Sequence, residues 1–243
     1  MTFATGQATG PGEEVLLTGA TGFLGVEVLA RYLEQDTRNV IALVRAADDS
    51  AAQQRIDDTL AGALGEAAGD YAGRVQAVAA DVARPGLGLP PARVRELAER
   101  SGTVVHCAAS VSFALPLSCA REVNVGGTSE MIAFAEAAME RGGLDRYVQI
   151  STAFVAGTHA GRFSERDLYL GQDFRNPYEQ SKCEAELLIR AAQRLPVTVL
   201  RPSIVVGDRR TGWTAAFNVI YWPLRAFAKG LLGTVPAVPS AGV

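Results

Sequence analysis

Two residues separated by one helical turn, Tyr178 and Lys182, could together transfer a proton. They lie in the segment NPYEQSK at the start of a helical run, and residues four apart share one face of a helix. Free tyrosine, with a pKa of about 10, is a poor acid or base at neutral pH. A lysine ammonium within about 4–6 Å lowers that pKa. The pair therefore predicts a phenol that donates a proton to a developing alkoxide, although an isolated YxxxK pattern is more typical of a solvated helix face.

A pair of hydroxyl side chains, Ser151 and Thr152, ends a predicted strand in the segment YVQISTAFVAG. A hydroxyl at that edge of a sheet could donate a hydrogen bond to a substrate carbonyl and help to hold an oxyanion. The alternative is a hydroxyl that only closes the turn after the strand.

A glycine-rich turn near the start of the chain predicts where a nucleotide binds. In LLTGATGFLG an apolar run, 15–18, leads into Gly19, Gly22 and Gly25, and helical spacing continues over 23–33. Strand, turn and helix in this order suit a pyrophosphate. The first glycine allows the tight turn, the second lets the backbone approach the phosphates, and the third lets the helix pack on the strand. The helix N-terminus supplies free N–H groups and the positive end of its dipole.

Short apolar runs alternate with longer helical patterns along the chain. The expected strands span 15–18, 39–44, 75–80, 103–107, 146–151 and 197–201, and the expected helices span 23–34, 50–64, 91–100, 116–140 and 178–194. Such alternation predicts βαβ units with right-handed crossovers. The expected fold class is α/β, a doubly wound, Rossmann-like parallel sheet. Its strands should be apolar on both faces, and its ligand should bind at their carboxyl ends.

The composition argues against several classes of protein. With 243 residues, 48% of them apolar, the chain can bury the core of one large domain, with or without an appendage. A net charge of −3 without Lys/Arg clusters argues against a nucleic-acid binder. Three cysteines without CxxC spacing indicate a reducing, cytoplasmic location, and two histidines without ligand-like neighbours predict no metal site. Residues 1–14 lack a signal-peptide pattern and are expected to form a disordered lead-in.

The residue after the second predicted strand indicates which dinucleotide binds. In NAD-binding folds a carboxylate about twenty residues after the glycines commonly holds the ribose 2′-hydroxyl. Here VIALVRA places Arg45 at that point. A guanidinium suits a 2′-phosphate, which it can grip through two parallel charge-assisted hydrogen bonds. Asp48 and Asp49 would repel a phosphate if they faced it, and an exposed arginine at a strand end is the alternative. We expect NADPH.

These segments together resemble the extended short-chain dehydrogenase/reductase superfamily. The matching pieces run from residue 15 to about 208 and are TGATGFLG, AADV at 79–82, VVHCAASVSF, NVGGT, ISTAFVAG, YEQSK and RPSIVVGD. Within the superfamily, LVRA, VHCAASVSF, STAFVAG and RPSIVVGDRRTGW look most like fatty acyl-CoA reductases and the thioester reductase domains of carboxylic acid reductases and peptide synthetases.

The resemblance implies a role for each matching site position. The residues that would line the pyrophosphate are Gly19, Thr21, Gly22, Phe23 and Leu24, with Gly25 behind them. Those that would contact the rest of the cofactor are Asp81 and Val82 at the adenine, Ala108 and Ala109 at the nicotinamide ribose, and Pro202 and Ile204 at the nicotinamide. The implied catalytic group is Thr152, Tyr178 and Lys182, with Lys182 also bonding the ribose and Asn124 stabilising the site from the fourth helix.

The same resemblance implies the reaction, which is NADPH-dependent reduction of an acyl thioester to an aldehyde, which a second hydride could take to an alcohol. The thiol carrier would be coenzyme A or a carrier protein. One alternative is a nucleotide-sugar epimerase or dehydratase of the same superfamily, although the apolar end of the chain counts against it. Another is a non-catalytic NADPH-binding module, which would have no need of a proton donor.

The end of the chain, 211–243, changes in composition and is expected to begin a substrate-binding portion after an NADP-binding domain at 15–210. It holds both tryptophans, and Asn218, Pro223, Arg225 and Lys229 interrupt any run long enough to span a membrane. Three interpretations stay open: one wall of an acyl pocket, an amphipathic face lying on a membrane surface, or plain core. The family usually continues beyond the length of this chain, so we expect an incomplete acyl pocket and association into a homodimer through 211–243.

Overall fold

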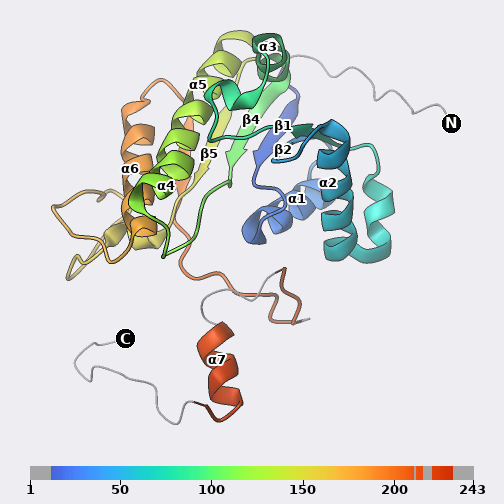
Figure 1. The fold of residues 1–243 in the computed structure, drawn as a ribbon. Helices are drawn as coiled ribbons and strands as arrows, with labels where there is room; N and C mark the ends of the chain where they lie inside the picture. The colour runs from blue at the N-terminus through green and yellow to red at the C-terminus, as the bar shows by residue number, and fades with distance from the viewer. Residues whose placement is uncertain (1–11, 211, 216–220, 232–243) are drawn as a thin grey trace. The chain divides into compact units, whose positions relative to one another are not determined.

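The computed structural model describes residues 12–210, 212–215 and 221–231 (Figure 1). Its contacts divide the chain into two units, Met1–Ser203 and Ile204–Val243. The lead-in predicted over 1–14 is too long, because Glu14 already belongs to the first strand and is buried. Residues 1–11 lie outside the described residues. The predicted boundary at 210/211 stays a prediction.

The described part of the first unit contains a six-stranded parallel sheet. Its strands are β1 (Glu14–Thr18), β2 (Val40–Val44), β3 (Val75–Ala79), β4 (Ser101–His106), β5 (Arg146–Ile150) and β6 (Val197–Leu200). Their order is β3-β2-β1-β4-β5-β6, and every neighbouring pair is parallel. The chain moves outward in one direction from β1 and in the other from β4, so the switch point lies between these two strands. The predicted doubly wound, Rossmann-like fold is confirmed.

Helices connect successive strands as expected. They are α1 (Phe23–Gln35), α2 (Asp49–Leu64), α3 (Pro91–Arg100), α4 (Leu117–Arg121), α5 (Gly127–Arg141) and α6 (Pro177–Ala191), with short helical turns η1 (Gly65–Tyr71), η2 (Pro85–Gly88), η3 (Glu122–Gly126) and η4 (Ala153–Ala156). The uninterrupted helix predicted over 116–140 is wrong in one respect, because η3 is a π-helical turn that joins α4 to α5. A single wide turn hardly changes the apolar periodicity, so the pattern could not reveal it.

Each face of the sheet has its own apolar core, because alternate strand residues point to opposite faces. Leu16 and Ile41 pack with residues of α3, α5 and α6, whereas Leu17 and Ala42 pack with residues of α1 and α2. Figure 1 shows these two groups of helices on the two sides of the sheet. Every residue of β1, β2 and β4 is buried, as expected for strands that are covered on both faces.

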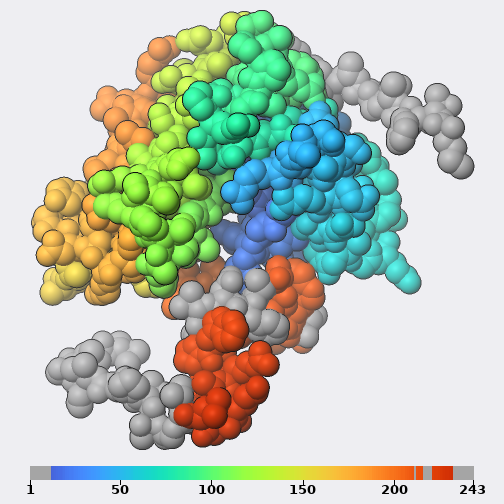
Figure 2. Space-filling view, viewed as in Figure 1, coloured from blue at the N-terminus to red at the C-terminus, as the bar shows by residue number. Residues whose placement is uncertain are grey.

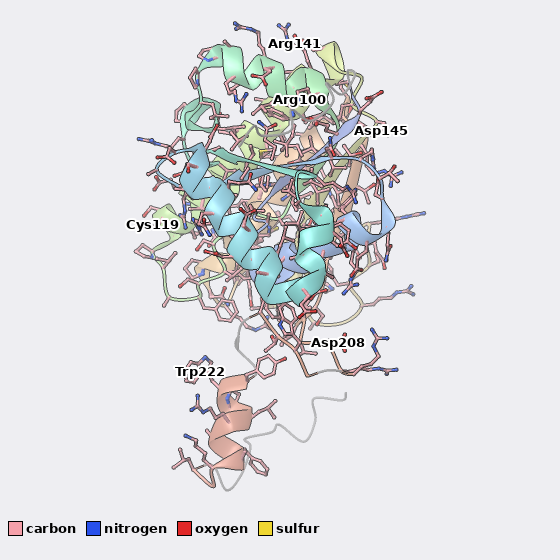
Figure 3. The ribbon with its side chains drawn as sticks, turned by 90° about the vertical axis from the view of Figure 1, so that its right-hand side faces the viewer. Arg100, Cys119, Arg141, Asp145, Asp208 and Trp222 are labelled. Carbon is pink, nitrogen blue, oxygen red and sulfur yellow. The ribbon has the colours of Figure 1, made fainter. Side chains whose placement is uncertain are left out.

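A polar network lies at the amino ends of the strands, opposite the predicted site. Arg100 donates hydrogen bonds to Glu14 at 2.6 Å and to Gln76 at 2.7 Å, and Figure 3 shows Arg100 and Asp145 at this end of the unit. A buried carboxylate such as Glu14 needs this kind of partner, so we assign the network a structural role. The carboxyl ends of the strands are where a doubly wound sheet binds its ligand.

The described part of the second unit includes one helix, α7 (Tyr221–Ala228). Trp222, Leu224 and Phe227 on this helix are exposed. The chain contains no helix, among its described residues, with the length and apolar character needed to cross a bilayer. Residues 216–220, which include Phe217 and Asn218, lie outside the described residues.

Candidate active site

The glycine turn after β1 forms a cradle that stays open because its glycines lack side chains. Gly19 has a φ of 72°, and a Cβ atom there would lie 2.7 Å from the backbone nitrogen of Ala108. A Cβ atom at Gly25 would overlap the carbonyl oxygen of Gly19. Both positions therefore require glycine: the first for the left-handed turn, the second for the close approach of α1 to β1.

The first turn of α1 presents backbone N–H groups at this cradle. Gly22 precedes the helix and caps it without a side-chain hydrogen bond, and the first N–H groups of a helix have no partner within it. Phe23, Leu24 and Gly25 supply these donors, and the helix dipole favours an anion there. In Figure 2 the darker blue atoms around α1 lie in a hollow between the green atoms around α4 and the lighter blue atoms of α2. These residues fit the pyrophosphate of a dinucleotide.

Two arginines lie together at the end of β2. Arg45 is exposed, and the guanidinium of Arg55, on α2, donates a hydrogen bond to its carbonyl oxygen. The two acids that could have opposed a phosphate are engaged elsewhere. Asp48 caps α2 by accepting from Ala51 N at 2.8 Å, and Asp49 accepts from Ala79 N at 2.8 Å. Arg55 was not predicted from the sequence, because its pairing with Arg45 arises from the packing of α2 beside the end of β2.

The predicted adenine contacts, Asp81 and Val82, lie in a tightly built loop after β3. The Asp81 carboxylate accepts from Ala83 N at 3.0 Å, and the Asp81 N–H donates to Leu87 O at 2.9 Å. Leu87 is 1% exposed at a φ of 61°, a conformation that costs energy for a branched side chain. The core contact of Leu87 holds this loop in place, and the adenine roles stay predictions.

A buried network at the end of β4 orients Ala108, beside which the nicotinamide ribose is expected. The Thr18 hydroxyl accepts from Ala108 N at 3.1 Å and lies 2.7 Å from His106 Nδ1. Burial, together with the Lys182 ammonium, lowers the pKa of His106 to about 3, so the imidazole is neutral. Burial raises the pKa of Cys107 to about 12, which fits an inert packing thiol. Thr18 and His106 were not predicted as residues of the site.

The start of α6 fixes Tyr178 in the first turn of that helix. Asn176 caps the helix by accepting from Glu179 N at 3.0 Å, and Pro177 takes the first helical position. The Thr152 side chain lies close enough to the Tyr178 phenol to oppose the rise of its pKa. Thr152 also accepts from Phe154 N at 3.2 Å, so it both closes the turn after β5 and faces the phenol.

Lys182 lies one turn further along α6 and is 4% exposed. Its ammonium donates to Ile150 O at 2.7 Å. Burial lowers the pKa of Lys182 to about 8, while Cys107 and Glu186 act in the opposite direction. The expectation that Lys182 lowers the pKa of Tyr178 is wrong for this structure. Burial raises that pKa, and only the Thr152 side chain opposes it. The Lys182 ammonium is directed to the main chain instead.

Asn124 lies in the π-helical turn η3 and is 2% exposed. Its side chain accepts from Ser110 N at 2.8 Å and donates to Ser110 O at 3.0 Å and to Ser181 Oγ at 2.9 Å. The wide turn thus joins the segment after β4 to α6 between Tyr178 and Lys182. These hydrogen bonds are the contacts through which Asn124 would play its predicted supporting role. Ser181 is a further partner that was not predicted from the sequence.

The remaining predicted positions are in the segments that follow two strands: Ala109 lies after β4, and Pro202 and Ile204 lie after β6. Ala109 follows Ala108 directly after β4, and the Phe113 ring lies 5.7 Å from the Tyr178 ring. Pro202 O accepts from Ala153 N at 2.9 Å, which ties the segment after β6 to the turn after β5. Ile204 belongs to the second unit, and its contact with the nicotinamide stays a prediction. Within the described residues, no group of three or more His, Cys, Asp or Glu side chains could hold a metal ion.

The fold and this site define an NAD(P)-binding domain of the extended short-chain dehydrogenase/reductase type. The chain belongs to the Male sterility protein family, whose model matches residues 17–242, and the predicted family is confirmed. Over 222 residues it is 37% identical to isonitrile lipopeptide synthase from Streptomyces coeruleorubidus, covering 90% of this chain and 15% of that protein. Over 241 residues it is 34% identical to the L-2-aminoadipate reductase large subunit from Eremothecium gossypii, covering 92% and 17%.

Among solved structures, the terminal R domain from the myxalamid PKS-NRPS biosynthetic pathway superposes with a TM-score of 0.80 at 31% identity. The match covers 91% of this chain and 57% of that one. The chain thus spans less than a fifth of the two relatives above and somewhat over half of this R domain.

Proposed function

We propose that this chain catalyses the NADPH-dependent reduction of an acyl thioester to an aldehyde. The observation that carries the proposal is the proximity of the Thr152 and Tyr178 side chains at the carboxyl edge of the sheet, where the glycine cradle after β1 also lies. Similarity to an aminoadipate reductase and to the R domain of a peptide synthetase pathway supports a thioester rather than a ketone substrate.

The chain's own residues would position the carbonyl and supply the proton. The hydroxyls of Thr152 and Tyr178 donate to the thioester oxygen and stabilise its developing negative charge, and the bound cofactor supplies the hydride to the carbonyl carbon. Tyr178 then gives its proton to that oxygen. The tetrahedral hemithioacetal then collapses: its hydroxyl returns its proton to the Tyr178 oxygen, the carbon–sulfur bond breaks, and the aldehyde leaves with a thiolate that takes up a proton from water to become the thiol. A second hydride would give the alcohol.

The preference for NADPH over NADH is supported by the two cationic side chains at the end of β2. Arg45 and Arg55 bring positive charge to the position where an NAD-binding protein carries a carboxylate, and a guanidinium matches a phosphate in shape as well as charge. The carboxylates of Asp48 and Asp49 accept hydrogen bonds from main-chain N–H groups of α2 and β3, so these interactions hold them in place.

The thiol carrier is coenzyme A or a carrier protein, and residues 211–243 begin the portion that receives the acyl chain. The exposed side chains of Trp222, Leu224 and Phe227 support association through this segment. Trp222→Gln with Phe227→Gln should then lower the dimer fraction in sedimentation, and an unchanged dimer fraction would argue against this interface. The unpaired state of Cys107, Cys119 and Cys183 supports a reducing, cytoplasmic location.

The test is NADPH oxidation against a panel of acyl-CoA and acyl-carrier thioesters of increasing length, with aldehyde and alcohol products separated. A thioester reductase consumes one NADPH for each aldehyde formed. A nucleotide-sugar epimerase would instead convert a sugar nucleotide without net cofactor consumption, and a non-catalytic module would bind NADPH and oxidise none.

A further inference from the structure

We propose that Glu186 is a positioning residue of this active site, acting through Ser151 and Lys182. The inference rests on the proposed function, because it concerns the same catalytic group. Glu186 lies one helical turn beyond Lys182 and two beyond Tyr178, so all three share one face of α6.

Three consecutive residues at the end of β5 and just after it, at positions 150–152, each contact one of these three α6 residues. The contacts are Ile150 O with Lys182 Nζ at 2.7 Å, Ser151 Oγ with Glu186 Oε2 at 2.6 Å, and the Thr152 side chain with the Tyr178 phenol. Ser151 lies between the two residues that hold Lys182 and Tyr178. Fixing the Ser151 hydroxyl therefore fixes the backbone that presents both Ile150 O and the Thr152 hydroxyl.

The Glu186 carboxylate is itself held rigidly. It is 2% exposed, and Arg201 Nε donates to its two oxygens at 3.0 and 3.1 Å. Arg201 also donates to Ser164 O at 3.2 Å and to Asp167 O at 2.7 Å, so the segment between β5 and α6 fixes the guanidinium. A buried ion pair adds little net stability compared with apolar residues of the same volume. The position of the Glu186–Arg201 ion pair behind Ser151 therefore favours a role in orienting the site over a role in stabilising the fold.

Glu186 also supplies a carboxylate whose charge acts on Lys182. The groups that face Lys182 are Glu186 on α6 and the thiol of Cys107 and the imidazole of His106 at the end of β4. His106 is neutral, and burial raises the pKa of Cys107 to about 12, so its thiol stays protonated at neutral pH. The Glu186 carboxylate therefore provides the negative charge that favours the buried ammonium. That charge keeps Lys182 as the donor to Ile150 O.

The experiment observes Lys182 directly. The chain has two lysines, Lys182 and Lys229, so protein labelled with ¹³C at lysine Cε gives two signals, which Lys229→Arg assigns. Titration by NMR is compared for the unmodified chain, Glu186→Gln and Ser151→Ala. Glu184→Gln is the matched control, because Glu184 lies on the same helix and pairs with Arg121 at 2.6 Å on the surface.

Glu186→Gln should move the Lys182 titration to lower pH, because a neighbouring negative charge is lost, and Glu184→Gln should leave it in place. In turnover, Glu186→Gln and Ser151→Ala should lower kcat by about tenfold or more, with NADPH affinity within a few-fold. Should Glu186→Gln fail to fold, Ser151→Ala decides, since it keeps the ion pair. Ser151→Ala with an unchanged Lys182 signal and unchanged kcat would overturn the proposal, as would an unmoved Lys182 titration in a folded Glu186→Gln.

The two readouts separate this inference from the proposed function. If the unmodified chain produces no aldehyde from any thioester, the proposed function fails, yet the Lys182 titration still reports on Glu186. If the unmodified chain is active and Glu186→Gln matches it in kcat and in the Lys182 titration, only the positioning role fails.

Discussion

The ammonium of Lys182 lies 2.7 Å from the carbonyl oxygen of Ile150, and this hydrogen bond joins α6 to the end of β5. It directs the positive charge to the main chain rather than to the Tyr178 phenol. Burial raises the pKa of Tyr178, and only Thr152 opposes this rise. The phenol therefore keeps its proton at neutral pH. A protonated phenol is the form that donates a proton to a developing alkoxide.

Removing only the phenolic hydroxyl should separate chemistry from binding. Tyr178→Phe should reduce the rate of thioester reduction by at least about a hundredfold, since one positioned proton donor contributes about that much, and NADPH affinity should stay within a few-fold. Rates and fluorescence titration of NADPH measure the two effects. Tyr169→Phe, at a side chain that is 60% exposed, is the control and should match the unmodified chain. Unimpaired reduction by Tyr178→Phe would remove the phenol from the mechanism.

Cofactor preference should depend on the two arginines at the end of β2. The unmodified chain should bind NADPH at least about tenfold more tightly than NADH, which corresponds to about 1.4 kcal/mol. Arg45→Ala and Arg55→Ala should each weaken NADPH binding and leave NADH binding nearly unchanged, because only the 2′-phosphate contact is lost. Isothermal titration of both cofactors measures this difference.

Arg141→Ala offers a control of equal charge, because Figure 3 shows Arg141 at the end of the unit that also carries Arg100 and Asp145. It should leave both affinities unchanged. Equal affinities of the unmodified chain for NADPH and NADH would refute the assignment.

The buried lysine should make stability depend on pH in a defined window. The pKa of Lys182 falls from an ordinary value of 10.5 to about 8 in the folded chain. Between these values the unfolded chain binds more protons at Lys182 than the folded chain, so its contribution to stability becomes more favourable as pH rises. The free energy of unfolding of the unmodified chain, relative to Lys182→Met, should therefore increase from pH 8 to pH 10.5. Urea titrations across this range measure it, and a constant difference would contradict the buried, depressed lysine.

Two glycine-to-alanine changes should have opposite effects. Gly25→Ala forces a Cβ atom against the carbonyl oxygen of Gly19, which should cost about 1–3 kcal/mol of stability and weaken NADPH binding. Gly62, inside α2, has open space around its Cβ position. Gly62→Ala should stabilise the chain by about 0.5–1 kcal/mol and leave NADPH binding unchanged. Thermal unfolding with and without NADPH checks both, and a Gly25→Ala chain as stable as the parent would contradict the tight turn.

The sheet could be predicted from sequence because each strand is a short apolar run bounded by polar or glycine-containing segments. β1 and β2 are buried on both faces, so their apolar runs are continuous and easily recognised. Tyr178 and Lys182 could be placed on one helix face because spacing alone fixes that relationship. Spacing alone could not predict the hydrogen-bond partner of each side chain, such as Ile150 O for Lys182.

The features that sequence missed depend on packing between distant segments. Arg55 meets Arg45 only because α2 packs beside the end of β2, and Ser151 meets Glu186 only because α6 packs on β5. Neither pairing has a local signature. The π-helical turn around Asn124 was hidden for a different reason, since one wide turn leaves the flanking helical periodicity intact.

The most direct measurement of the central claim is a single-turnover reaction of excess chain with an acyl thioester and NADPH that carries deuterium at the transferable C4 position. Mass spectrometry of the product should find an aldehyde with one deuterium on its carbonyl carbon, one equivalent of free thiol and one of oxidised cofactor. Tyr178→Phe should form this aldehyde far more slowly while binding the same labelled cofactor. An aldehyde without deuterium, or intact thioester beside fully bound NADPH in the unmodified chain, would contradict the account.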